Sequence, residues 1–252
     1  MKTLHIVNIR PVLTFLLLVF GCSTSFAQLS ISIPLGSELS SKNIEVLSVD
    51  FMTEEISKWG SLDENGDITF SLSYDYMDEL LKEAKKQQKD APKGWTLTFK
   101  TAGSEHTCEY GESTIEVENP DSRLFGVPSF FAGIESEKKR YGDMYAASNE
   151  AVATWLHGYQ MGSASTGFYV EWIYAEGDAT VKGSCTRNTG TGYGDEEFDA
   201  VTNYNLQFKE GWNTVVHQID EVFDSASGTS YVKTKSVFTT KFYEDLYWYV
   251  LD

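Results

Sequence analysis

The sequence predicts a mainly-β protein: an antiparallel β-sandwich or meander with one or two short helices. Aromatic residues make up 14% of the 252 residues, and there are only 5 prolines. This balance favours strands, in which aromatic and β-branched residues are enriched. Short runs alternate apolar and polar residues with the period of two that a half-buried strand requires. Clusters of Gly, Ser, Asp and Asn separate these runs and predict turns.

Residues 1–27 have the three parts of a bacterial signal peptide. Lys2 and Arg10 give a positively charged start, an apolar run over 12–20 follows, and small residues lead up to Ala27. The apolar run is shorter than the roughly 20 residues that a membrane-spanning helix needs. We therefore expect cleavage after Ala27 and export of the remainder to the periplasm, the cell envelope or the medium.

A lipid anchor is the alternative outcome for the same segment. Val19-Phe20-Gly21-Cys22 resembles a bacterial lipobox, in which Cys22 would become the lipidated first residue. That pattern prefers Leu where Val19 stands and a small residue where Phe20 stands, so we favour cleavage after Ala27. No other stretch is apolar enough to cross a membrane, and we expect no transmembrane segment in the mature chain.

The chain is strongly acidic. It carries 37 Asp and Glu residues against 20 Lys and Arg residues, a formal net charge of −17 at pH 7. Such a surface repels phosphate backbones, which argues against nucleic acid as a partner. It attracts cations, including Ca²⁺, although a solvated acidic surface is the simpler interpretation. We expect no cofactor.

We divide the mature chain into an N-terminal β-rich part with one amphipathic helix, residues 28–120, and a C-terminal antiparallel β-sandwich part, residues 121–252. In the first part, alternating runs over 44–51 and 68–72 predict a hairpin. The Asn-Gly pair at 65–66, just before the second run, is the strongest short turn signal.

Two helices are predicted. Asp75 can cap the first helix. On one side of this helix lie Met77, Leu80, Leu81, Ala84 and Gln88, and lysines cover the other sides. Pro92 then ends it. The second helix is short and covers Asn149–His157, with Ser148 as its cap.

The C-terminal part has the more regular pattern. Strands are predicted over 168–174, 180–185, 204–208, 214–223, 231–242 and 246–251. Turns that contain Gly, Ser or Asp join them, which is typical of an antiparallel meander in a sandwich or an open barrel.

Three segments of this part, 172–183, 206–213 and 246–249, combine turns with aromatic strand ends. They resemble a group of uncharacterised exported β-rich, β-sandwich proteins from Bacteroidetes-like bacteria, and the Ala27-Gln28 junction suits that group. The resemblance covers mainly residues 140–252. It implies a fold and an exported location, and it brings no catalytic residues with it.

Cys108 and Cys185 are the two cysteines that remain after cleavage at Ala27. They are candidates for a disulfide, because exported proteins fold in an oxidising compartment. Each also lies in an alternating, strand-like run, so two buried free thiols are an equal alternative. The distance between their Cα atoms decides between the two, and the sequence does not provide it.

Asp63, Asn65 and Asp67 are the candidates for a metal site, because their alternate spacing is that of a calcium loop. An EF-hand loop needs Gly at its sixth position and Glu at its twelfth. Here those positions hold Ile68 and Tyr74. We interpret the segment as a hairpin turn and predict no metal.

No catalytic constellation is evident. The acidic run over 195–199 suggests a glycosidase, but that reaction needs two carboxylates placed on opposite sides of a sugar. The sequence contains no Gly-x-Ser-x-Gly elbow to indicate a serine hydrolase. We therefore assign no catalytic residue.

Trp212, Tyr247 and Tyr249 are the candidate ligand-binding residues. Flat aromatic faces cover the apolar faces of sugars, and an exposed aromatic patch usually marks a binding site. The leading hypothesis is an exported, non-enzymatic module that binds a glycan or an envelope protein through an aromatic and acidic surface. The alternatives are a carbohydrate-active hydrolase with carboxylates from separate strands and a structural scaffold without a small-molecule ligand.

Overall fold

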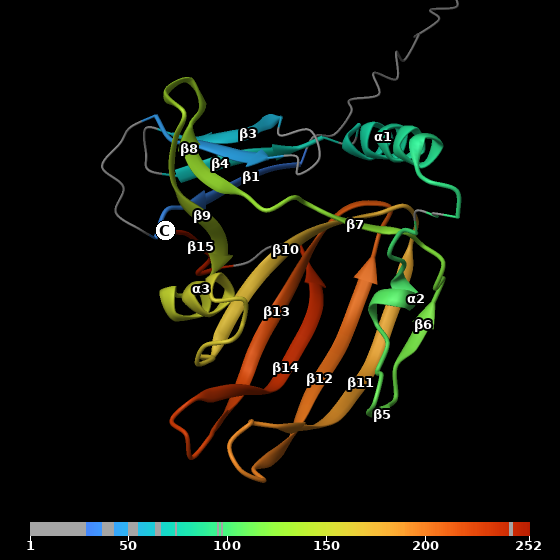
Figure 1. Cartoon of the computed structure of the whole chain (residues 1–252), viewed down its shortest axis with the longest axis vertical. Coiled ribbons are helices and arrows are strands. Elements are labelled where there is room, and N and C mark those ends of the chain that lie inside the picture. The colour runs from blue at the N-terminus through green and yellow to red at the C-terminus, as the bar shows by residue number, and fades with distance from the viewer. Residues whose placement is uncertain are drawn as a thin grey trace, which may run out of the picture.

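The computed structural model describes residues 29–36, 43–49, 55–63, 67–73, 75–94, 96, 98–241 and 244–252. The predicted signal peptide and Cys22 lie outside this part of the chain. The elements, in order, are β1 (Leu29–Pro34), β2 (Glu45–Val49), β3 (Ile56–Leu62), β4 (Asp67–Leu72), α1 (Tyr76–Asp90), α2 (Ala102–Glu105), β5 (Glu112–Ser113), β6 (Glu116–Glu118), β7 (Leu124–Gly126), β8 (Phe131–Ile134), the 3-10 turn η1 (Glu135–Glu137), β9 (Lys139–Ala147), α3 (Glu150–His157), β10 (Gly167–Ala175), β11 (Ala179–Gly190), β12 (Glu197–Phe208), β13 (Gly211–Asp224), β14 (Ser230–Thr240) and β15 (Tyr247–Leu251). Strands dominate, so the mainly-β prediction is confirmed (Figure 1).

Hydrogen bonds join the described strands into one mixed sheet. Its order is β1-β4-β3-β2-β8-β9-β10-β13-β14-β12-β11-β5, with β15 on β9, β6 on β11 and β7 on β10. The predicted antiparallel sandwich is not confirmed, because β14 folds back on β13 and inserts between β13 and β12. It therefore runs antiparallel to β13 and parallel to β12. Alternation shows that a strand exists but not which strands become its neighbours, so the sequence missed this insertion.

The N-terminal strands form a meander in place of the predicted hairpin. β3 pairs with both β2 and β4, so it separates the two runs that were expected to pair directly. At the predicted turn the N–H of Asp63 donates to the carbonyl of Asp67 at 2.8 Å, and residues 64–66 lie outside the described part. The sequence missed β3 because most of its residues are exposed and show no alternation.

The N-terminal strands cover one face of the C-terminal strands, at one end of them (Figure 1). The core between the two layers is centred on Phe70 of β4, whose ring meets Trp172 edge-on at 4.7 Å and Trp248 at 5.6 Å between centroids. The sheet also continues across residue 120, where the sequence suggested a boundary, because β2 pairs with β8 and β6 pairs with β11. The two parts of the chain thus share one sheet, and residues from both pack in the core cluster around Phe70.

α2 packs against the opposite face of the C-terminal strands, while β5 and β6 extend the sheet along the edge of β11. Buried apolar residues lie between α2 and the sheet, including Ala102, Val181, Leu206, Phe208 and Val215. The structure joins Cys108 to Cys185 of β11 in a disulfide, with Cα atoms 5.5 Å apart. The sequence predicted no helix here, and α2 is short: Thr101 and Ser104 form a capping box around a single turn.

Two helices lie where the sequence placed them. α1 follows Asp75, although the side chain of Asp75 makes no capping hydrogen bond. The cap of α3 is Asn149 and not Ser148, because the Asn149 side chain accepts from the N–H of Val152 at 3.0 Å. The hydroxyl of Ser148 instead accepts from the N–H of Phe168, and so ties α3 to β10.

Candidate functional site

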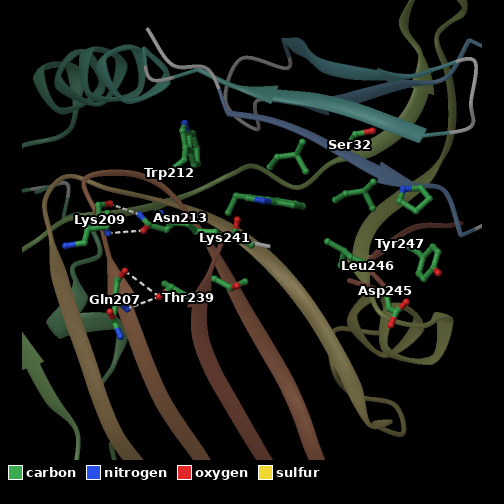
Figure 2. Close-up of a pocket in the computed structure, with 16 residues that line it drawn as sticks. Ser32, Gln207, Lys209, Trp212, Asn213, Thr239, Lys241, Asp245, Leu246 and Tyr247 are labelled. Carbon is green, nitrogen blue, oxygen red and sulfur yellow. Dashed lines mark hydrogen bonds between the residues drawn. The ribbon is translucent and has the colours of Figure 1, made fainter. Parts of the chain in front are cut away.

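A large open cleft lies between β1 and the ends of β12, β13 and β14. Its volume is about 1030 Å³. Figure 2 shows β1 on one side of it, with Trp212 and Lys209 at one end and Asp245, Leu246 and Tyr247 at the other. Two of the three aromatic residues selected from the sequence therefore line the same cavity, although 35 positions separate them.

Trp212 is fixed at its end of the cleft. Its indole N–H donates to the carbonyl of Ser73 at 3.0 Å. Its ring stacks on Tyr76 of α1 at 5.8 Å and meets Tyr174 edge-on at 5.5 Å. The half-buried indole thus connects α1 to β13 as well as lining the cleft, and it forms a rigid end wall.

Tyr247 and Tyr249 differ in burial. Tyr247 is half-buried and lines the cleft. Tyr249 is only 9% exposed and packs with Trp155 of α3 in a core cluster. Tyr247 packs against the same cluster, with its ring edge-on to that of Tyr249 at 6.5 Å. Burial raises the pKa of the Tyr249 hydroxyl. Tyr249 therefore does not contribute the exposed aromatic face that the sequence suggested, because its ring faces the core beneath α3.

The polar side of the cleft comes from the turn between β12 and β13 and from the end of β14. The buried Asn213 side chain accepts from the N–H of Lys209 at 2.9 Å and donates to the Lys209 carbonyl at 2.7 Å, which holds this turn closed. Gln207 and Lys241 are exposed and line the cleft. Their side chains have no hydrogen-bond partner within the described part of the chain, so both can bind a ligand.

Two of the metal candidates, Asp63 and Asp67, are joined by hydrogen bonds. The carboxylate of Asp63 accepts from the N–H of Asp67 at 3.0 Å, and Asn65 lies outside the described residues. Nowhere in the described part do three or more His, Cys, Asp or Glu side chains gather as a metal-binding group.

The acidic run over 195–199 joins two loops. The carboxylate of Glu196 accepts from the hydroxyl of Ser225, from the N–H of Ala226 at 3.0 Å and from the hydroxyl of Thr191 at 2.9 Å. The Ser225 hydrogen bond is the main reason why the pKa of Glu196 lies below its ordinary value. The structure thus gives this glutamate a role in holding loops together.

A second cavity lies on the opposite face of the C-terminal strands, beside α2. It has a volume of about 410 Å³, and we call it the polar pocket. Its charged and polar lining includes Glu171 of β10, His217 of β13, Lys235 of β14 and Tyr204 of β12. Branched apolar residues complete the wall, among them Leu124, Ile173, Val215 and Val237.

Glu171 and His217 form a fixed pair in this pocket. His217 Nε2 lies 3.0 Å from Glu171 Oε2, and because a carboxylate only accepts, Nε2 carries the proton. Nδ1 of His217 is buried without a hydrogen-bond partner among the described groups. Burial raises the pKa of Glu171, but the His217 hydrogen bond and the nearby charges of Lys235 and Lys100 lower it more. The net effect keeps Glu171 ionised.

The sequence did not select Glu171, His217 or Lys235. All three lie on the face of the sheet that carries the core cluster beneath α2, and most of their neighbours two residues away are apolar or aromatic: Tyr169, Ile173, Val215, Ile219 and Val237. Lys233 is the exception. A charged residue at such a position is the signal in the sequence that could have indicated a site. It identifies a site only when the order of the strands is known, because the three residues come from three different strands.

Comparisons of this chain with protein-family models, with curated proteins and with solved structures give no match. Within the described residues, no helix combines the length and the apolar character needed to cross a membrane. Function therefore has to be inferred from the geometry of the cleft and the polar pocket.

Proposed function

We propose that this chain is an exported binding module and that the cleft holds a glycan. The observation that carries this proposal is the open cleft of about 1030 Å³ with an aromatic ring at each end, Trp212 and Tyr247. The exposed Lys241 lies between these ends, and the exposed Gln207 lies near Lys209 at the Trp212 end (Figure 2). Sugars need both features, because their ring faces are apolar and their hydroxyls require hydrogen-bond partners.

Export is part of the proposal. The charged, apolar and small-residue order of residues 1–27 supports it. The Cys108–Cys185 disulfide supports it independently, because disulfides persist mainly in oxidising compartments. N-terminal sequencing of the protein recovered from the cell envelope and medium tests this point. Gln28 as the first residue is expected, whereas a lipidated Cys22 would indicate an anchored form.

Binding is favoured over hydrolysis. A glycosidase needs one carboxyl group that stays protonated near neutral pH. Glu171 and Glu105 come from separate elements and line the polar pocket. However, the pKa of Glu171 is lowered, and the carboxylate of Glu105 accepts from Lys100 at 2.6 Å. Neither residue is placed as a general acid, so this pair does not support the hydrolase alternative.

Calorimetric titration of the protein with a panel of soluble oligosaccharides tests the glycan proposal. Tyr247→Ala and Gln207→Ala are each expected to weaken binding about three- to tenfold, because one stacking or hydrogen-bond contact contributes about 0.5–1.5 kcal/mol. Tyr193→Ala is the matched control, since Tyr193 is an exposed tyrosine that does not line the cleft. It should leave the affinity unchanged.

Two results would overturn the proposal. The first is that no oligosaccharide binds while the chain captures an envelope protein, and Tyr247→Ala abolishes that capture. This result would make the cleft a protein-binding surface. The second is wild-type behaviour of Tyr247→Ala in both assays, which would favour a scaffold role. Circular dichroism of each variant verifies that it is folded.

A further inference from the structure

The polar pocket lies on the opposite side of the C-terminal strands from the cleft, and its charged groups meet because of strand register. Tyr169 and His217 are directly opposite each other in the β10–β13 pairing, and Ile219 is opposite Lys235 in the β13–β14 pairing. Side chains at alternate positions share a face, so Glu171, His217 and Lys235 project to the same side of the sheet. Three adjacent strands thus bring an acid, an imidazole and an amine to one cavity.

Two opposite charges in this pocket are not paired with each other. Lys235 and Glu171 interact electrostatically, yet they are too far apart to form a salt bridge. The ammonium of Lys235 has no hydrogen-bond or ion-pair partner among the described residues. Glu171 uses one carboxylate oxygen for His217. The other carboxylate oxygen and the Lys235 ammonium both remain open to a ligand.

The remaining charges of the pocket are already neutralised. Lys100 and Glu105 form an ion pair at 2.6 Å near α2. The charges left for a ligand are therefore one negative, on Glu171, and one positive, on Lys235. A ligand that carries both an ammonium and a carboxylate matches this arrangement, because it would pair both the exposed Glu171 carboxylate and the half-buried Lys235 ammonium.

The wall of the pocket determines which uncharged part the ligand can have. Leu124, Ile173, Val215 and Val237 present branched apolar side chains beside the charged groups. A volume of about 410 Å³ suits a small molecule. Burial lowers the pKa of Lys235, which reflects the cost of holding an ammonium there without a partner. A carboxylate on the ligand would remove that cost.

We propose that the polar pocket binds a small zwitterion with an apolar body, an α-amino acid such as leucine, with its ammonium on Glu171 and its carboxylate on Lys235. This site lies on the other side of the sheet from the cleft, with Trp172 common to both linings, and the proposal does not depend on the glycan. Free amino acids and the zwitterionic ends of larger molecules share this chemistry. The probes below show which of the two charged groups of the ligand the pocket recognises.

The experiment is calorimetric titration of the purified protein with L-leucine, N-acetyl-L-leucine and L-leucinamide. Acetylation removes the ammonium charge and amidation removes the carboxylate charge, while the side chain stays the same. L-leucine is expected to bind. Each derivative should bind at least about tenfold more weakly than L-leucine, because each loses a charge-assisted hydrogen bond. Equal binding of L-leucine and N-acetyl-L-leucine would overturn the proposal in favour of a simple anion site.

Variants locate the binding. Lys235→Met and Glu171→Gln should each weaken L-leucine binding about tenfold or more. Lys182→Met and Glu197→Gln remove an exposed lysine and an exposed glutamate that do not line the pocket, and should have no effect. Tyr247→Ala should also leave L-leucine binding unchanged, which separates this site from the cleft. No heat of binding at millimolar L-leucine, or wild-type affinity in Lys235→Met, would show that the proposal is wrong.

Discussion

Tyr169 and His217 stack on each other with ring centroids 4.6 Å apart and planes 4° from parallel. They are directly opposite each other on β10 and β13, so the sheet register itself produces the stack. The stack supports one face of the imidazole while Glu171 holds Nε2 at 3.0 Å. The position of His217 is therefore determined from two directions, and the charge state of Glu171 is coupled to it.

The first prediction concerns stability in acid. The pKa of Glu171 is lower in the folded protein than in the unfolded chain, because the His217 hydrogen bond and nearby positive charges outweigh the effect of burial. The resulting stabilisation is present above the unfolded value of about 4.3 and is lost as pH falls through the folded pKa. Glu171→Gln should therefore be less stable than wild type at pH 6 and approach it at pH 3.

Urea unfolding at pH 6, 5, 4 and 3 measures this difference. Glu197→Gln is the control, because it removes the same charge from an exposed glutamate outside the pocket. A gap between Glu171→Gln and wild type that stays constant over this range would contradict the prediction.

The second prediction concerns the disulfide. Cys108 and Cys185 are 77 positions apart, so their bond closes a long loop in the unfolded chain. For a loop of this length, the chain-entropy relation gives a stabilisation of about 4.5 kcal/mol. The double variant Cys108→Ser/Cys185→Ser should lose about that much free energy of unfolding in urea, and reduced wild-type protein should behave like it. Equal midpoints for oxidised and reduced wild type would refute the prediction.

The third prediction concerns the start of α3. Asn149→Ala removes the side-chain acceptor of the Val152 N–H and should cost about 1 kcal/mol of stability. Thr154→Ala is the matched control, since Thr154 is exposed on the same helix and alanine is the better helix former. Chemical denaturation of both variants measures the effect. Equal stability of the two would mean that Asn149 does not act as the cap.

The sequence predicted local structure well. Apolar-polar alternation located the six strands β10 to β15, since a half-buried strand must alternate. It did not locate β7, β8 and β9, which lie in the same C-terminal part of the chain. The period of about 3.6 and the lysines located α1, and the positions around 149–157 located α3. It failed at β3, where Ile56–Leu62 are mostly exposed and no alternation marks the strand. It also failed at α2, which consists of four residues and has too short a pattern to detect.

The sites depend on strand order, which local patterns do not encode. Trp212 and Tyr247 could be selected from the sequence as aromatic residues, but their shared cleft arises from the position of β1 against β13 and β15. Glu171, His217 and Lys235 were missed because each is isolated in its own strand. They meet because β13 lies between β10 and β14, and that order follows from the insertion of β14 between β13 and β12.

The last prediction tests whether the two parts of the chain unfold together. Phe70 of β4 is fully buried, and its ring contacts Trp172 of β10, Trp248 of β15 and Phe130. Phe70→Ala removes the contact shared by both layers, and a buried Phe→Ala change costs about 3–5 kcal/mol. We expect a loss of that size in urea unfolding, and a smaller loss for Phe70→Leu, which keeps most of the apolar volume.

Tryptophan fluorescence and far-ultraviolet circular dichroism should report the same midpoint for wild type and for Phe70→Ala, because one core serves both layers. Val49→Ala is the control: Val49 is 44% exposed on β2 and its truncation should change stability by less than about 0.5 kcal/mol. Two separate transitions in wild type would mean that the N-terminal strands unfold on their own. In that case Phe70→Ala would shift only the transition that reports the N-terminal strands, and the cleft could open while the polar pocket stays intact.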